Sequence, residues 1–166
     1  MAVKTDFTPE EWKTLLESAM MAGIAVTAAD PSGLWGTLKE SMTSARMVMG
    51  AKRDADASEL VKAIAADYET SEGRAAAREG LRSQLSGKRP AEITAKALEA
   101  LKEAAAIVAA KAPAESAAYT GWLRQISQSV ADASTEGGFL GFGGVKVSDA
   151  EKATLAQISS SLGLPA

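Results

Sequence analysis

The chain has 166 residues and a net charge of −3 at pH 7, and it contains neither cysteine nor histidine. Their absence excludes disulfides, zinc–thiolate sites, iron–sulfur clusters, thiol nucleophiles and Ser-His-Asp triads. The length suits one compact domain with a hydrophobic core, which we predict to cover residues 1–166, and the weak negative charge argues against a nucleic acid as partner.

The apolar segments are short. The most apolar one, residues 18–29, is about a dozen residues long, which is too short to span a bilayer. The N-terminal residues lack the apolar core of a signal peptide. We therefore expect a cytoplasmic protein with no membrane span.

Helix signals run through the whole chain. Alanine, the best helix former, is abundant, and the alternating β-branched runs that are typical of strands are missing. The sequence predicts an all-α fold, a compact bundle of about seven helices with a Gly/Phe-rich loop before the last helix. The predicted helices cover residues 9–29, 32–49, 57–69, 71–85 and 90–112, a sixth that opens at Pro113, and a seventh that ends near residue 162.

Two helix starts carry the pattern of a capping box, in which a hydroxyl and a carboxylate three residues apart accept each other's backbone N–H groups. Thr8 and Glu11 form one such pair, and Ser148 and Glu151 form the other. Gly163 is placed to end the last helix, because glycine adopts the left-handed conformation found after a helix C-terminus.

The first predicted helix is apolar on all sides over residues 20–29, so we expect it to lie at the centre of the bundle. Ala19, Gly23 and Thr27 recur every four residues along it and would let a neighbouring helix approach closely. The sixth helix carries a clean apolar face, formed by Tyr119, Trp122, Leu123, Ile126 and Val130.

The segment 137–144 contains five glycines together with Phe139, Leu140 and Phe142. Glycine loops before a helix can hold phosphate, but this one matches no nucleotide-binding motif. We expect a tight connection whose apolar side chains close the bundle. The alternative is a partner-binding loop that exposes Phe139 and Phe142.

Arg74, Arg78 and Arg82 lie four residues apart and therefore line one face of the fourth predicted helix, which Ser71 is expected to cap. Such a face suits an acidic partner, a lipid head group or nucleic-acid phosphates. The opposing interpretation is a solvated face neutralised by nearby carboxylates, which are Glu69, Glu72 and Glu79.

Five of the six methionines fall into two clusters, Met20 with Met21, and Met42 with Met47 and Met49. Thioethers bind Cu(I) or adapt to a hydrophobic partner. Core packing explains the seven-residue spacing of Met42 and Met49, and the missing histidine and cysteine argue against a metal.

Asp30, Asp149 and Glu151 lie at helix junctions and offer the oxygen ligands that Ca²⁺ or Mg²⁺ prefers. No EF-hand loop is present, and helix capping explains Asp149 and Glu151 without an ion. Both interpretations stay open, with capping favoured.

The stretch from Ala28 to Gly33 and the segment from Val147 to Lys152 resemble the helix junctions of TerB-like tellurite-resistance domains. These are cytoplasmic bacterial all-helical domains linked to stress response and to acidic cation-binding sites. The resemblance implies an ion site at Asp30, Asp149 and Glu151. The pattern breaks at Pro31-Ser32, and the alternative is a separate bacterial helical family.

Two functions fit these features, and a third is disfavoured. The first is a non-catalytic, stress-associated interaction protein that self-associates or binds a protein partner, because the helices are rich in alanine and carry small-residue stripes. The alternative is a binding module for a hard cation or a small apolar ligand held between helices. An enzyme is disfavoured, because no spacing singles out a pair of acid–base groups, and we expect no cofactor.

Overall fold

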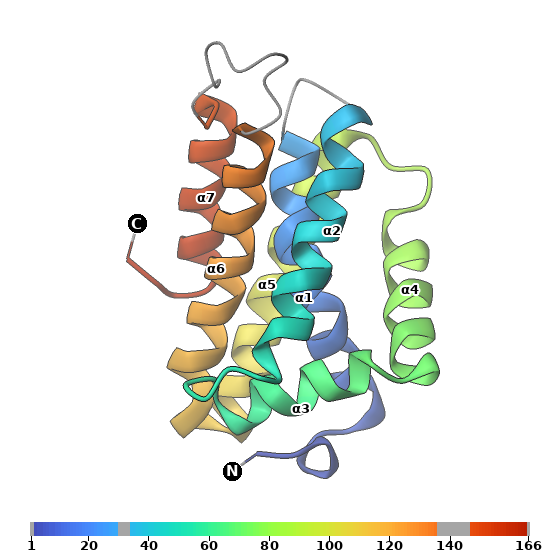
Figure 1. Cartoon of the computed structure of the whole chain (residues 1–166), viewed down its shortest axis with the longest axis vertical. Helices are drawn as coiled ribbons and strands as arrows, with labels where there is room; N and C mark the ends of the chain where they lie inside the picture. The colour runs from blue at the N-terminus through green and yellow to red at the C-terminus, as the bar shows by residue number, and fades with distance from the viewer. Residues whose placement is uncertain (1, 30–33, 136–146, 166) are drawn as a thin grey trace.

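The computed structural model describes residues 2–29, 34–135 and 147–165, with backbone only at 34–42, 134 and 135. Within these ranges the chain forms seven α-helices, two short 3-10 helices and no strand, which confirms the predicted all-α bundle (Figure 1). The elements are η1 Lys4–Asp6, α1 Pro9–Ala29, α2 Leu34–Ala51, α3 Glu59–Tyr68, α4 Ser71–Leu85, α5 Pro90–Lys111, η2 Pro113–Glu115, α6 Ser116–Thr135 and α7 Asp149–Ser161.

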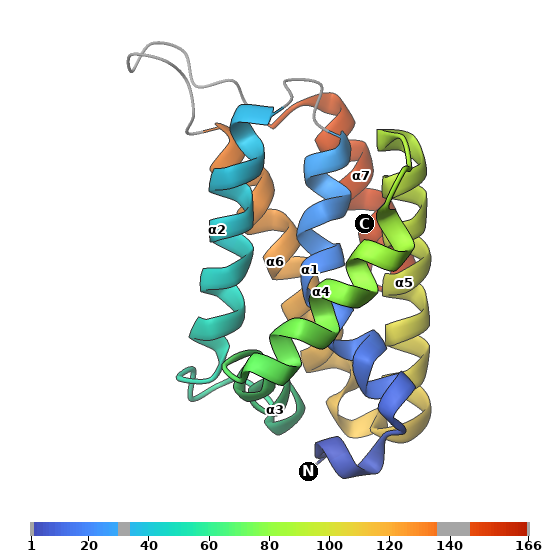
Figure 2. The same cartoon turned by 90° about the vertical axis from the view of Figure 1, so that its right-hand side faces the viewer.

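The helix α1 lies at the centre of the bundle, as its apolar second half predicts. It packs against each of the six other α-helices of the described chain (Figures 1 and 2). At Gly23 a Cβ atom would lie 2.2 Å from Ser44 Oγ of α2 and 3.3 Å from Val130 Cγ2 of α6. Glycine at this position therefore allows the close helix approach that the small-residue stripe predicts.

The apolar face of α6 is buried as predicted, and its members are Tyr119, Trp122, Leu123, Ile126 and Val130. Two buried polar contacts join this helix to α1. The hydroxyls of Tyr119 and Ser18 share a hydrogen bond of 2.7 Å, and Ser127 Oγ donates to the carbonyl of Ala22 at 2.9 Å. The hydroxyl groups of these contacts are thus satisfied, whereas Trp122 Nε1 on the same face of α6 is buried without a hydrogen-bond partner among the described residues.

Both predicted capping boxes are present. Glu11 N–H donates to Thr8 Oγ1 at 3.2 Å and Thr8 N–H donates to Glu11 Oε2 at 2.7 Å. Ser148 and Glu151 make the same reciprocal pair at 3.2 and 2.7 Å. Gly163 has a φ of +70°, so it ends α7 in the conformation expected of it.

Some helix boundaries differ from prediction by one to three residues. The largest difference is at α6, which begins at Ser116 because Pro113 opens the 3-10 helix η2 instead. The helix α3 begins at Glu59, two residues after the predicted start at 57, because Ser58 is its N-cap. The helix α4 is capped by Thr70, whose Oγ1 accepts from Gly73 N–H at 2.9 Å, so Ser71 is its first residue rather than its cap. The helix α2 continues to Ala51. No helix in the described ranges is both long and apolar enough to cross a membrane.

Candidate functional site

A groove with a volume of about 450 Å³ lies between α2 and α4. Its walls come from four helices that are far apart in sequence, α1, α2, α3 and α4. The side chains that give it an apolar surface are Met20, Val48, Met49, Tyr68, Ala77 and Leu81. Its volume exceeds those of three other hollows on the described surface, which measure about 190, 330 and 380 Å³. Its volume lies within the range of roughly 300–1,000 Å³ that ligand sites occupy.

The short helix α3 sets the width of the groove. It crosses the base of the bundle between the end of α2 and the start of α4 (Figure 1). Its 10 residues span about 15 Å at 1.5 Å per residue. The helix α4 therefore packs on α1, α3 and α5, whereas α2 packs on α6, α1 and α3 (Figure 2).

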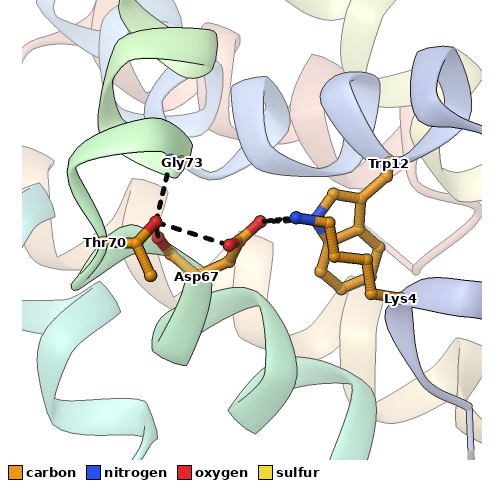
Figure 3. A network of polar contacts seen from close by, with 5 residues as sticks. All are labelled: Lys4, Trp12, Asp67, Thr70 and Gly73. Atoms are coloured by element: carbon orange, nitrogen blue, oxygen red, sulfur yellow. Dashed lines mark hydrogen bonds and ion pairs between the residues drawn. The ribbon is translucent and has the colours of Figure 1, made fainter.

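The corner between α3 and α4 is fixed by the carboxylate of Asp67 (Figure 3). Asp67 Oδ2 accepts from Trp12 Nε1 at 2.7 Å and from Lys4 Nζ at 2.9 Å. Its backbone carbonyl accepts from Thr70 Oγ1 at 2.7 Å. A Cβ on Gly73 would lie 2.1 Å from that carbonyl oxygen. Only glycine therefore fits at position 73, in the first turn of α4.

These contacts decide the charge state of Asp67. Burial alone would raise the pKa of its carboxyl, but the hydrogen bonds from Lys4 and Trp12 outweigh burial and hold the pKa below its ordinary value. The carboxylate is therefore charged at neutral pH, and it joins the N-terminal segment, α1 and the α3–α4 corner.

The helix α4 rests on α1 above a second carboxylate, that of Glu17, which is only 4% exposed. Gln84 Nε2 donates to Glu17 Oε2, and Lys13 Nζ lies 3.8 Å from Glu17 Oε1. A Cβ on Gly80 would lie 1.5 Å from Glu17 Oε1, so glycine alone makes room for this carboxylate beneath α4.

Burial raises the pKa of Glu17, while Lys13 and Gln84 oppose the rise only in part and the charge of Glu103 adds to it. The neighbouring Tyr68, which lines the groove, donates its hydroxyl to the carbonyl of Leu16. Burial first, and then the charge of Glu17, raises the pKa of Tyr68 above its ordinary value. Its hydroxyl therefore stays protonated as a donor and is no general base at neutral pH.

The rim of the groove carries three charged residues, Glu69, Arg74 and Arg78. Glu69 is paired with Lys52. Arg74 Nη1 donates to the carbonyls of Tyr68 and Glu69 at 3.1 and 2.8 Å, at the C-terminal end of α3. A guanidinium there satisfies the last carbonyls of a helix and complements its dipole.

The predicted neutralisation of the arginine face by Glu69, Glu72 and Glu79 is not found. Within the described part of the chain, none of Arg74, Arg78 and Arg82 forms an ion pair with a carboxylate. The reason is that Glu69 is taken by Lys52 and Arg74 is turned to backbone carbonyls.

The structure brings together features that the sequence presented separately. Met20, Met49, Arg74 and Arg78 all line the groove. Arg82, one turn further along α4, is exposed and lies outside it. Met21 is fully buried in the core, and Met47 is packed against it.

The predicted acidic site is only partly visible. Asp149 is exposed, and its Oδ1 lies 3.3 Å from Lys152 Nζ. Glu151 is buried and accepts from Ser148 N–H in the capping box. Across the described residues, no three acidic side chains gather as metal ligands would. Asp30, Phe139 and Phe142 lie outside the described residues, so the proposed cation site and the partner-binding loop stay predictions.

Sequence reasoning did not find Glu17 or Asp67. The partner of Glu17 lies 67 residues away, and Asp67 lies 55 residues from Trp12. No local spacing signals such pairings. Gly73 and Gly80, seven residues apart on one face of a predicted helix, were the available hint that another element approaches it.

Compared with known proteins, the chain matches no family model, no curated protein and no solved structure. The resemblance to TerB-like domains stays a prediction. The function is therefore argued from the groove itself.

Proposed function

We propose that this chain is a non-catalytic interaction module that receives an amphipathic helix of a protein partner in the groove between α2 and α4. One observation carries the proposal: an apolar groove opens on the surface, and the two guanidinium groups on its rim form no ion pair within the described part of the chain. Helix-in-groove recognition uses this combination of an apolar floor and a charged edge. A cytoplasmic, stress-associated setting remains part of the proposal.

The composition of the floor supports a protein segment as occupant. Met49 is 51% exposed, one of two large hydrophobic residues so exposed among the described side chains. Met20 joins it in the groove. Methionine is flexible and polarizable, and it is used at surfaces that adapt to the side chains of a partner helix.

The test is a titration with amphipathic helical peptides followed by NMR. We expect the amide and methyl signals of Met49, Ala77 and Leu81 to shift, and Met49→Asp to weaken binding at least about 10-fold, because it places a charge on the apolar floor. Val3→Asp is the matched control, since Val3 is similarly exposed, at 47%, but does not line the groove.

The same variants identify other occupants. A dimer of the protein alone that dissociates in Met49→Asp would make a second copy the occupant, as the predicted self-association requires. Shifts confined to another face would contradict the proposal.

A second candidate is supported by the size of the groove, because about 450 Å³ also suits a small apolar ligand. Native mass spectrometry of the purified protein distinguishes the two. An organic adduct that Met49→Asp removes would favour the small ligand.

A further inference from the structure

The charges on the groove rim do not cancel. Glu69, the one carboxylate among the described residues of the rim, is already paired with Lys52. Arg74 contacts only neutral carbonyl oxygens, and Arg78 has no hydrogen bond or ion pair within the described part of the chain. The α4 side of the rim therefore presents two positive charges that no carboxylate of the described residues pairs with.

Arg74 is held in place before any partner arrives. Its Nη1 donates to two carbonyls at 2.8 and 3.1 Å, which fixes the plane of the guanidinium at the end of α3. A guanidinium has five N–H donors, so most of them remain for a ligand. Because the group is already ordered, little side-chain entropy is lost when it binds a carboxylate.

Arg78 follows Arg74 by one helical turn, and both lie at the edge of the apolar floor. Residues four apart on a helix are about 5–6 Å apart at Cβ. A second helix lying along α4 presents its own side chains at the same interval, so acidic residues four apart on one edge of it would meet both guanidiniums.

We propose that the partner helix is acidic along one edge, with Asp or Glu residues at positions i and i+4 that pair with Arg74 and Arg78, and apolar on the face that enters the groove. The inference rests on the proposed function and names the chemistry of its partner. Arginine binds carboxylates in a forked geometry, which makes such pairs selective as well as attractive.

An anionic membrane surface is disfavoured as the source of the negative charge. The chain has a net charge of −3, and Glu72 and Glu79 are exposed on the same helix as the arginines. A broad negative surface meets all of these charges, whereas a single helix in the groove meets only the rim.

The experiment is a selection from a displayed library of helical peptides about 18 residues long, roughly five turns. The apolar face is restricted to Leu, Met and Phe, and two edge positions four residues apart vary among Glu, Gln and Lys. We expect Glu to be enriched on the wild-type protein, and Lys to be enriched on the double variant Arg74→Glu/Arg78→Glu. Arg82→Glu is the matched control, since Arg82 lies outside the groove, and it should leave the Glu preference unchanged.

Selected peptides are then remade with Glu or Gln at the edge and their Kd values measured. We expect the Glu peptide to bind about 10-fold more tightly in dilute buffer, with the ratio shrinking as salt is added.

Equal binding of both peptides, with both lost in Met49→Asp, would overturn the acidic-edge inference and leave the proposed function standing. A library that yields no groove binder would overturn both. Pelleting with vesicles of phosphatidylserine and phosphatidylcholine that depends on Arg74 and Arg78 would also overturn the inference, because the anion would then be a lipid head group.

Discussion

The carboxylate of Glu17 is nearly buried, and its contacts compensate for burial only in part. It accepts a hydrogen bond from Gln84 and lies 3.8 Å from Lys13, which is itself half-exposed. Because burial raises its pKa above the ordinary 4.5, the folded protein holds this proton more tightly than the unfolded chain does. Its contribution to stability is therefore full below the unfolded pKa and is lost as the pH rises through the folded pKa.

We predict that Glu17→Gln raises the free energy of unfolding at pH 7 by about 1 kcal/mol, since the amide keeps an acceptor for Gln84 without a buried charge. Urea unfolding between pH 4 and 8 checks this, and the variant should lose less stability than the wild type across that range. Glu99→Gln, which removes an exposed carboxylate on α5 that does not contribute to the pKa of Glu17, is the control and should change little. A less stable Glu17→Gln would show that the charge itself holds α4.

Asp67 has the opposite effect on the pH dependence. Its pKa is held below the ordinary 3.8, so its stabilising contribution is present above the unfolded pKa and is lost as the pH falls through the folded pKa. Trp12 Nε1 and Lys4 Nζ both donate to Oδ2 of this carboxylate, and its negative charge strengthens both hydrogen bonds.

We predict that Asp67→Asn lowers the free energy of unfolding at pH 7 by about 1–2 kcal/mol. The difference from the wild type should shrink as the pH falls below the ordinary pKa of 3.8 and the wild-type carboxylate takes up a proton. Thermal unfolding across this range measures both effects. Asp149→Asn removes an exposed carboxylate with a single exposed ion pair and should cost almost nothing.

At the scale of elements, glycines mark where helices touch. Gly23 and Gly121 both lie within helices, but a Cβ at Gly23 would collide with Ser44, whereas a Cβ at Gly121 would meet nothing within 4 Å. The two positions have the same intrinsic preference for alanine, so the difference between them isolates packing.

We predict that Gly23→Ala destabilises the protein by about 1–3 kcal/mol, because the buried Ser44 hydroxyl must leave its position and the Val130 side chain must shift. Gly121→Ala should stabilise by up to about 1 kcal/mol through helix propensity. Equilibrium unfolding of the two variants gives the comparison. Equal effects at both positions would mean that α1 and α2 are not in close contact at Gly23.

The local part of the fold could be predicted from the sequence and the groove could not. Thr8 with Glu11, and Ser148 with Glu151, predicted two helix starts because a capping box is complete within four residues. The sequence did not distinguish Thr70 from Ser71 as the N-cap of α4, because both side chains carry a hydroxyl and only the backbone conformation separates them. Met20, Met49 and Arg74 meet only through tertiary packing.

At the scale of the whole molecule, the helices differ in how firmly they are attached. The described part of α4 buries only Gly73, Ala77 and Gly80, none of which has a large side chain. The central α1 buries Trp12, Leu15, Leu16, Met21 and Val26 among others. Burial of large apolar side chains is the main source of local stability.

We predict that α4 opens separately, with amide exchange reporting an opening free energy at least about 2 kcal/mol lower than that of α1. Native-state hydrogen exchange followed by NMR measures both helices in one sample. Glu17→Gln should reduce this difference in opening free energy, because it removes the buried charge on which α4 packs. Equal protection in α1 and α4 would show that the bundle unfolds as one unit.

The support of α4 by glycine and alanine has an evolutionary consequence. Gly73 and Gly80 are buried against the rest of the bundle, where a Cβ would lie 2.1 Å from the carbonyl oxygen of Asp67 and 1.5 Å from Glu17 Oε1. Arg74 and Arg78, on the groove side of the same helix, contribute little to the core. Selection for a folded chain and selection for a particular partner therefore act on different faces of one helix, and descendants of this protein are free to change what they bind while keeping how they fold.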